Sequence, residues 1–475
     1  MPFNLPLVRG DKQSNLDYTD LLPINLTPVV RSVKGDTGYL LANDGLTEFA
    51  EVSGKARGGF YNERMKMHFR VSGNKLESIS ETGSVEVIGV IGGTDVCQFA
   101  ASFNTQAILS EGRFYLYDGA TLTEVKSPNI GFPTDVTWFR GVYVFTDGEN
   151  VYQTDILDEF SISPLKYVTS EFSNDPTIAV RQTNNNQIIA FNRTSIEYFY
   201  FNPAAGVGTS VLEPVQGKSN KIGIAGVNCV VEMAGVYFCV GSRENESHKF
   251  YMIGSAGSEQ VFSTRYVNQI LDELTQEQVA SIYLESRYKD GQHILLAHLP
   301  ECTLIYNHTI ASQQGISAAW SFAQTGVDNP SKWRAKYGVY DVRVGKWIYG
   351  DTIDNKLAVL DSSTCAQYDE YQQHACYTPL IYLDGNIVMQ DIDLQSIPGY
   401  TAQDTSLMWS FTEDGVSYGQ ESTYRISTPL KYKSKIRLRN NGMFSDMFGI
   451  KFRFVSKDKQ AFSGLSINYR ARTTP

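Results

Sequence analysis

The residue types that perform catalysis or bind metals are present in this sequence, but their spacing gives no zinc-binding, phosphate-binding or serine-hydrolase motif. The six histidines form no His-Glu-x-x-His motif and no Cys/His cluster at zinc-ligand spacing, so the sequence predicts no metal site. Gly217-Lys218-Ser219 lacks the earlier glycine of a phosphate-binding loop, and we interpret it as a turn. A glycoside hydrolase needs two carboxylates at a fixed separation, and nothing selects such a pair among the 51 acidic residues. We therefore expect no enzymatic activity and no cofactor.

The clearest pattern of charged residues lies near the C-terminus. From residue 431 to residue 439 every second residue is a cation, and residues 451 to 453 continue the alternation around a phenylalanine. Successive side chains of a strand point to opposite faces, so these cations would lie outward and the apolar residues between them inward. We call this predicted surface the basic face, and its members are Lys431, Lys433, Lys435, Arg437, Arg439, Lys451 and Arg453.

Two interpretations of the basic face remain open. It is either a solvated outer face that discourages edge pairing or a contact surface, and we favour a contact surface because like charges on one strand repel unless acidic groups face them. Residues 429–475 hold eleven Lys/Arg and two acids, a balance of +9, so the other 428 residues carry −10 − 9 = −19. The acidic partner is then either phosphate or the acidic wall of another subunit.

The elements that would position these residues are β-hairpins. In residues 112–125 two alternating strands flank Asp118-Gly119, which predicts a hairpin with a type I′ turn. Similar hairpins follow about 30 to 55 residues apart, which is the spacing of β-propeller blades. Their turns lie at Gly73, Asp147-Gly148, Asn192, Ser242, Pro300 and Asp354. We predict a propeller of six blades of about 50 residues each, with seven as the alternative count. A long β-sandwich and a β-solenoid are the alternative folds.

The repeat also divides the chain. We expect an extended N-terminal arm over residues 1–38, which lies over the body or a neighbouring subunit unless it is a loose terminus. The propeller is expected over 39–365. Within it, residues 263–288 have helical spacing and a Thr275-x-x-Gln278 capping box, which predicts two short helices that project from one rim. Residues 366–475 return to strands and predict a C-terminal β-sandwich-like domain that carries the basic face.

Composition excludes several classes of protein. The first residues lack the apolar region of a secretion signal, and no apolar stretch is long enough to span a membrane. The six cysteines never have Cys-x-x-Cys spacing, and we expect them to be reduced and buried. A net charge of −10 argues against a protein whose main activity is binding nucleic acid.

Several short strings, spread in order along the chain, are similar to segments of one known family. They are residues 17–25, Ser195-Ile-Glu-Tyr-Phe199, Gly223-Ile-Ala-Gly226, Tyr251-Met-Ile-Gly-Ser255, Gln367-Tyr-Asp369, Tyr377-Thr-Pro-Leu380, Asp414-Gly-Val-Ser-Tyr-Gly419 and Gly449-Ile-Lys-Phe-Arg453. Each string is short, but they stay in order over nearly the whole chain. The family that they resemble is the packaged-DNA stabilisation protein, or tail hub (nozzle), of P22-like short-tailed bacteriophages, whose N-terminal "Y-x-D-x-L-P-x-N" segment is similar to residues 17–25.

The resemblance implies a structural protein of the virion, assembled in the host cytoplasm, that forms a homohexameric ring below the portal and its adaptor ring. Such rings close the DNA exit channel, seat the tail needle and hold the tailspikes, and packaged DNA passes through the lumen without sequence-specific contacts. We expect a neutral or acidic lumen, and we expect Lys433, Lys435 and Arg437 to contact acidic protein surface. The alternatives are a carbohydrate-binding or glycan-cleaving propeller and a cellular propeller scaffold.

Overall fold

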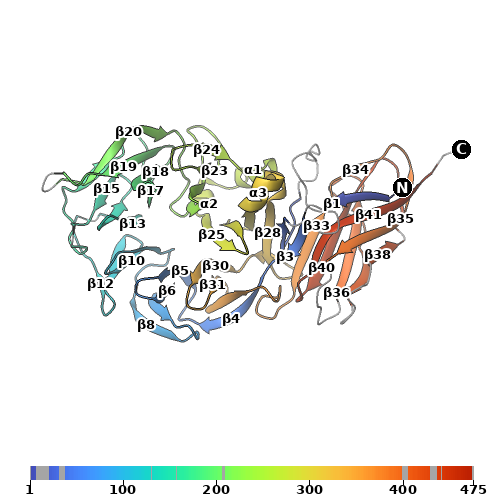
Figure 1. The fold of residues 1–475 in the computed structure, drawn as a ribbon, viewed down its shortest axis with the longest axis horizontal. Helices are drawn as coiled ribbons and strands as arrows, with labels where there is room; N and C mark the ends of the chain where they lie inside the picture. The colour runs from blue at the N-terminus through green and yellow to red at the C-terminus, as the bar shows by residue number, and fades with distance from the viewer. Residues whose placement is uncertain are drawn as a thin grey trace. The chain divides into compact units, whose positions relative to one another are not determined.

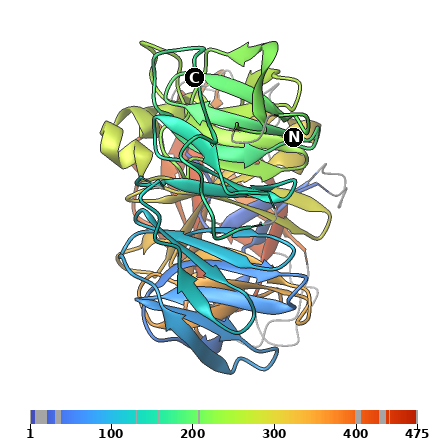
Figure 2. The ribbon, with the colours of Figure 1, turned by 90° about the vertical axis from the view of Figure 1, so that its left-hand side faces the viewer.

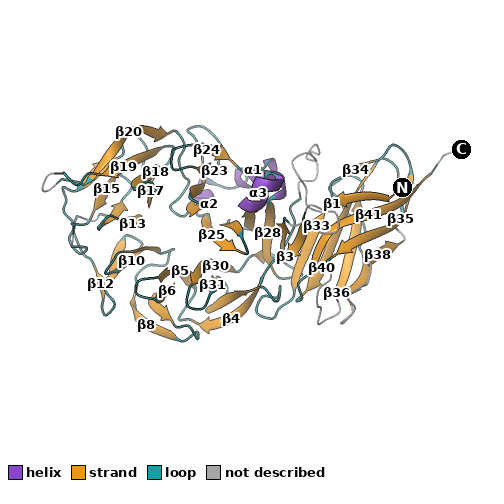
Figure 3. Ribbon diagram, viewed as in Figure 1, coloured by secondary structure: helices purple, strands orange, loops and turns teal. Residues whose placement is uncertain are grey.

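The computed structural model describes residues 2–6, 21–30, 38–129, 131–156, 158–205, 209–397, 405–427, 436–439 and 441–472. The chain forms two compact units. Unit 1 comprises Met1–Thr47, Arg287–Arg334 and Leu360–Pro475, and unit 2 comprises Glu48–Ser286 and Ala335–Val359. Strands dominate both units, with a few short helices (Figure 3).

Unit 2 consists of four-stranded antiparallel sheets, and most of them are built from four consecutive strands. Five sheets follow this rule: β5–β8, β9–β12, β13–β16, β17–β20 and β21–β24. The first two sheets contain β5 Ala56–Asn62, β6 Met67–Ser72, β7 Lys75–Ile79 and β8 Val85–Val90, then β9 Gln98–Ala101, β10 Gln106–Ser110, β11 Arg113–Tyr117 and β12 Leu122–Glu124. The next three contain β13 Asp135–Phe139, β14 Val142–Thr146, β15 Asn150–Gln153 and β16 Tyr167–Thr169, then β17 Thr177–Gln182, β18 Gln187–Asn192, β19 Ile196–Phe201 and β20 Leu212–Asn220, then β21 Val230–Met233, β22 Val236–Gly241, β23 Lys249–Ile253 and β24 Glu259–Val261. The first strands of successive sheets are neighbours, from β5 through β9 and β13 to β17. Figure 1 shows these sheets following one another around a curve, and Figure 2 shows them as successive layers from blue to green. Each sheet is therefore a propeller blade.

Two more sheets complete the set of blades. One contains β30 Ala335–Asp341, β31 Lys346–Asp351 and β32 Lys356–Asp361, and its fourth strand is β4 Gly45–Glu51 from before the first blade. Its first strand, β30, neighbours β5, so the last blade adjoins the first within unit 2. The other sheet, in unit 1, contains β25 Tyr283–Lys289, β26 Gln292–His298, β27 Thr303–Asn307, β28 Trp320–Thr325 and β29 Ser331–Lys332.

The described chain thus contains seven blade sheets, which corrects the favoured count of six. Each of the seven predicted hairpins lies in a different blade. The error came from the assumed length of a blade, since β5, β9, β13 and β17 begin at residues 56, 98, 135 and 177, which gives spacings of 42, 37 and 42. At Asp118-Gly119 only the glycine has positive φ, and the Asp118 carboxylate instead accepts two backbone N–H groups. The hairpin is confirmed, but its turn is not type I′.

The predicted helical insert is partly correct. Helix α1, Arg265–Asp272, and helix α2, Gln276–Ala280, bury Val267, Leu271 and Val279, and the capping box between Thr275 and Gln278 is present. The end of the predicted insert is wrong, however, because residues 283–288 belong to β25, in which Leu284, Glu285 and Arg287 are buried. Unit 1 adds a helix that was not predicted, α3 His308–Gln314, followed by the short 3-10 turn η2 Ile316–Ala318.

The remaining strands of unit 1 form two antiparallel sheets. One has the order β2-β3-β41-β35-β38, with β1 paired to β41 and β39 to β35; the other has the order β33-β40-β36-β37, with β34 paired to β40. Their bounds are β1 Pro2–Pro6, β2 Leu26–Val29, β3 Tyr39–Ala42, β33 Gln372–Tyr377, β34 Ile381–Tyr382, β35 Ile387–Ser396, β36 Thr405–Thr412, β37 Ser422–Ser427, β38 Ile436–Arg439, β39 Met443–Phe444, β40 Met447–Ser456 and β41 Ala461–Ala471. The described parts of the predicted N-terminal arm thus contribute β1 and β2 to the first sheet.

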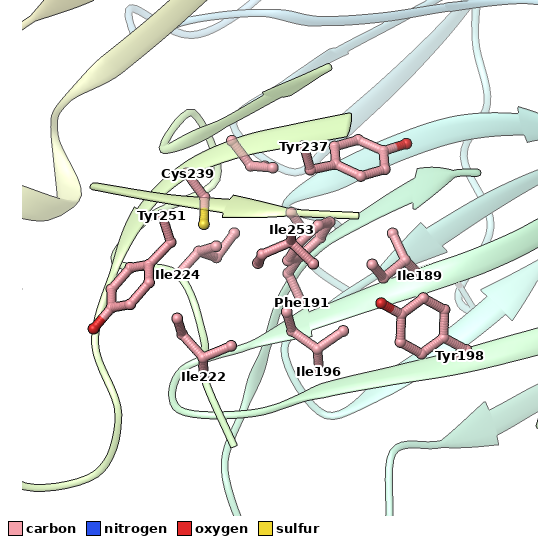
Figure 4. Close-up of a cluster of buried hydrophobic side chains, with 12 residues drawn as sticks. Ile189, Phe191, Ile196, Tyr198, Ile222, Ile224, Tyr237, Cys239, Tyr251 and Ile253 are labelled. Atoms are coloured by element: carbon pink, nitrogen blue, oxygen red, sulfur yellow. The ribbon is translucent and has the colours of Figure 1, made fainter. Parts of the chain in front are cut away.

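Blades are held together by apolar side chains between neighbouring sheets. Figure 4 shows one such cluster, in which side chains of β18 and β19 meet those of β22 and β23 around Phe191, Tyr198, Tyr237 and Cys239. The aromatic rings of Phe191 and Tyr237 lie edge to face, with centroids 5.4 Å apart. All six cysteines are free, and all except Cys302 are buried, as predicted.

Candidate assembly surface

The structure separates the described members of the basic face. Arg437 and Arg439 alternate with Ile436 and Leu438, which are 3% and 0% exposed, so the predicted inward and outward faces of this strand are confirmed. Their strand, β38, belongs to the sheet that contains β41. Lys451 and Arg453 lie on β40, which belongs to the other sheet. The structure therefore does not bring the two pairs of cations together on one sheet. Lys431, Lys433 and Lys435 lie outside the described residues.

The cations of β38 have acidic partners within their own sheet. The Nε and Nη2 atoms of Arg437 donate to the two carboxylate oxygens of Asp393 at 2.7 and 3.0 Å, and Arg439 Nε lies 3.7 Å from Asp391 Oδ1. Strand pairing places Asp393 directly opposite Arg437, and Asp391 opposite Arg439. Cross-strand pairs of opposite charge stabilise a sheet, so the acidic groups that we expected from another molecule are supplied here by β35.

The cations of β40 share one carboxylate. Arg453 Nε donates to Glu421 Oε1 at 3.0 Å, and Lys451 Nζ lies 3.6 Å from the same oxygen. The hydrogen bond from Arg453 is the main cause that lowers the pKa of Glu421, which keeps this carboxylate charged at neutral pH. Each of these four cations thus has an acidic partner inside the domain, although the four share three carboxylates. Whether the basic face contacts another molecule remains a prediction.

Two cations of the same region lack an acidic partner among the described residues. They are Arg470 and Arg472 at the end of β41, both exposed. Strand pairing places Val388 of β35 between Arg470 and Met443, and Arg472 Nη1 lies 3.3 Å from Met443 Sδ. We call these four residues the arginine tip. The arginine tip was not predicted, although the i, i+2 spacing of its arginines is the same signal that identified the basic face.

Comparisons with known proteins match both parts of this architecture. Residues 3–365 match the family described as "Bacteriophage P22 Gp10, beta-propeller", and residues 373–470 match "Bacteriophage P22 Gp10, beta-sandwich". The chain belongs to the bacteriophage P22 Gp10 family. It is 28% identical over 481 residues to the "Tail hub protein gp10" of Salmonella phage P22, with 98% of each chain covered.

Solved structures that resemble this Gp10-family chain are much more distant. Virginiamycin B lyase from Staphylococcus aureus is 8% identical with a TM-score of 0.42, and the alignment covers 66% of this chain and 98% of that chain. The Pan2 WD40 domain from Neurospora crassa is 8% identical with a TM-score of 0.43, covering 67% of this chain and 95% of that chain. We draw no functional conclusion from these likenesses.

A polar junction in unit 1 of the Gp10-family chain joins a blade to the β-sandwich. Asn25, whose φ is +53°, donates from Nδ2 to the carbonyl of Gln324 on β28 at 3.1 Å and to that of Gln373 on β33 at 2.8 Å. Asp44 forms ion pairs with Lys289 at the end of β25 and with Lys459 between β40 and β41. We call these contacts the junction; they tie the β25–β29 sheet and the sandwich into one compact unit.

A cavity in unit 2 of the Gp10-family chain bears on the glycan-cleaving alternative. It measures about 650 Å³ and is lined mainly by polar residues of the first blade strands and adjoining turns, including Gln98, Arg181 and Asn228. Its described lining includes one carboxylate, Glu232, whereas a glycosidase needs two. No group of three His, Cys, Asp or Glu among the described residues could hold a metal ion. None of the described helices has the length and apolarity needed to cross a bilayer.

Proposed function

We propose that this chain is the subunit of a tail hub that closes the portal channel of a short-tailed bacteriophage. The chain is a structural component of the phage virion, and its role is in the tail. The observation that carries the proposal is the order and extent of the two Gp10 domains, which cover residues 3–365 and 373–470 and so leave little of the chain for another function. In the proposed hub, six copies form a ring below the portal and its adaptor ring, retain the packaged DNA, and anchor the tail needle and the tailspikes.

The fold suits a load-bearing ring subunit in two respects. First, β4 completes the last blade from the other end of the repeat, and closure of this kind leaves few strand edges free to pair with other molecules. Second, the junction fixes one blade to the sandwich through partly buried polar contacts of Asn25 and Asp44. A ring subunit of this kind needs no chemistry of its own.

The number of copies in particles that also contain the portal protein tests the proposal. We expect six copies of this chain for each portal ring, measured by quantitative mass spectrometry of purified particles, and loss of packaged DNA from particles assembled without the chain. A particle population that retains its DNA without this chain would contradict the proposal, as would a number of copies that is incompatible with one ring.

The affinity of the chain for DNA tests the expectation that the lumen is neutral or acidic. Net charge is −10, so the ring should let DNA pass without adhering. We expect double-stranded DNA to show no measurable affinity for the purified chain at about 50 mM salt, where even nonspecific phosphate contacts are strong. Salt-dependent binding with a steep slope would instead indicate a lumen lined with Lys and Arg.

A further inference from the structure

Unit 2 carries a hollow with exposed aromatic walls that the proposed function does not explain. It measures about 580 Å³. It lies among the turn between β5 and β6, the turn between β9 and β10, the turn between β11 and β12, and the loop after β15. Phe103 and Phe160 line it and are 63% and 44% exposed, and Met65 lies beside them. Exposed aromatic side chains beside a depression are typical of the centre of a protein interface, because their burial contributes most of its binding energy. We call this site the aromatic hollow.

The rim of the aromatic hollow is negatively charged. Asp118, Asp158 and Glu159 line it, and none of them forms an ion pair with another described residue. Local hydrogen bonds hold the carboxylates in place: Asp118 accepts the backbone N–H groups of residues 120 and 121 at 2.8 and 2.7 Å, and Asp158 accepts that of Phe160 at 3.1 Å. Among the described lining residues one cation, Arg64, offsets the three carboxylates, which leaves a balance of 1 − 3 = −2 for these residues.

The hollow already shows how it accommodates a guanidinium group. The Cζ atom of Arg64 lies 5.2 Å from the centroid of the Phe103 ring, within the range of a cation–π contact. The other face of this ring is not covered by a second cation among the described residues. Phe103 also packs edge to face against Trp138, with centroids 6.3 Å apart, so the ring has an aromatic neighbour on the protein side while 63% of the residue stays exposed to a partner. A partner that brings arginine together with apolar side chains would match both the rim and the walls.

The arginine tip has this chemistry. Arg470 and Arg472 lack acidic partners among the described residues, whereas the four described members of the basic face all have them. Beside them, Val388 and Met443 are 39% and 52% exposed. The tip therefore offers an apolar surface and two guanidinium groups that have no acidic partner among the described residues. The hollow offers an apolar surface and carboxylates that have no cationic ion-pair partner among those residues.

We propose that the aromatic hollow of one copy of this chain receives the arginine tip of a second copy. The inference rests on the proposed function, because a ring of identical subunits needs two different and complementary patches on each of them. Guanidinium–carboxylate pairs at the rim fix the orientation of the partner, since they are directional and often bidentate. Burial of Phe103 and Phe160 against Met443 supplies the apolar part of the contact.

Photo-crosslinking identifies the occupant of the hollow. Phe160 is replaced by the photoreactive amino acid p-benzoylphenylalanine in the full-length chain, which is mixed with isotopically heavy unmodified chain at high concentration and irradiated. We expect cross-linked peptides that join the light residue 160 to heavy segments containing residues 387–396 or 441–472. Cross-links only to other segments of the chain, or no intermolecular cross-link from a sample that self-associates, would overturn the proposal.

Charge reversal separates the failure of this interface from failure of the hub. We expect Asp158→Lys/Glu159→Lys to weaken ring assembly by about tenfold or more, and Arg470→Glu/Arg472→Glu to do the same, with assembly recovered when both pairs are combined in one chain. The matched control is Asp272→Lys/Glu273→Lys, which reverses two exposed, adjacent acids at the end of α1 and should assemble like the unmodified chain. If the unmodified chain forms rings and the hollow variant assembles equally well, the interface is wrong but the hub stands. If the unmodified chain forms no ring even with portal protein present, the hub itself is wrong.

Discussion

Replacement of His374 by leucine should remove a large part of the pH dependence of the stability of the β-sandwich. His374 lies on β33 and is 1% exposed. Its ring stacks on that of Phe454, its cross-strand partner on β40, with centroids 4.6 Å apart and an interplanar angle of 4°. Burial disfavours the imidazolium form and lowers the pKa of His374 from 6.5 to about 3, although the backbone of Gln372 partly opposes this effect.

The size of the effect follows from proton linkage. A histidine whose pKa is lower in the folded than in the unfolded chain contributes its full stability above the unfolded pKa, and this stability is lost as the pH falls toward the folded pKa. With a pKa of 6.5 in the unfolded chain and about 3 in the folded chain, the loss between about pH 8 and about pH 5 is about 2 kcal/mol. His374→Leu cannot titrate, so its free energy of unfolding should fall by about 2 kcal/mol less over this interval.

Urea denaturation of the full-length chain at a series of pH values, followed by tryptophan fluorescence, measures this difference. The matched control is Phe454→Leu, which removes the stacked ring but keeps the histidine. It should be less stable at every pH, with the pH dependence of the unmodified chain. His68 in unit 2, whose pKa burial lowers to about 4, adds its own pH dependence to all three proteins and cancels in the comparison. If His374→Leu and the unmodified chain lose stability in parallel from about pH 8 to about pH 5, the reasoning is refuted.

Three further perturbations test other parts of the structure. Asp44→Ala leaves the two lysines of the junction without their carboxylate and should destabilise unit 1 by about 1 to 2 kcal/mol, because the ion pairs are only partly buried; chemical denaturation measures this, and an unchanged midpoint would contradict the role given to the junction. Reversal of Lys433, Lys435 and Arg437 to glutamate should lower ring assembly measured by mass photometry if the basic face contacts acidic protein, and unimpaired hexamers would count against that contact. Thr275→Ala removes the cap of α2 and should cost about 1 kcal/mol, while Thr275→Ser should retain most of the stability because it keeps the hydroxyl.

Local patterns in the sequence predicted the strands and hairpins well. Alternation and turn residues located a hairpin in every blade, and the capping box located α2, because these signals act between residues close in the sequence. The blade count was missed because a blade was assumed to be about 50 residues long, whereas β5, β9, β13 and β17 begin 37 to 42 residues apart. The pairing of β4 with β32, about 300 residues away, was not predicted either, because nothing in the sequence of β4 indicates its partner. The end of the helical insert was missed for a related reason. Residues 283–288 have apolar residues at spacings that fit both a helix and an inner strand, and packing against neighbouring blades decides between them.

The candidate site was harder to predict because it depends on which strands are neighbours. The cations of β38 looked unpaired in the sequence, yet Asp391 and Asp393 of β35 have the same i, i+2 spacing and lie directly opposite Arg439 and Arg437. Matching the period and sign of charges between strands could therefore have suggested this pairing. No such match exists for Arg470 and Arg472 among the described residues. The arginine tip therefore replaces the basic face as the candidate contact surface.

The N-terminal residues contribute strands both to the last blade and to one sheet of the β-sandwich. Residues up to 51 supply β4 to the last blade and β1, β2 and β3 to the sheet that contains β41. These strands are synthesised first, but β32, the partner of β4, ends at residue 361, and β41, the partner of β1 and β3, ends at residue 471. Contacts between residues so far apart in sequence are slow to form, because the intervening chain must first be ordered. The last blade is therefore completed only after residue 361 has been made, and the sandwich only after residue 471. Until then the edges of β4, β1 and β3 are open to pairing with other chains.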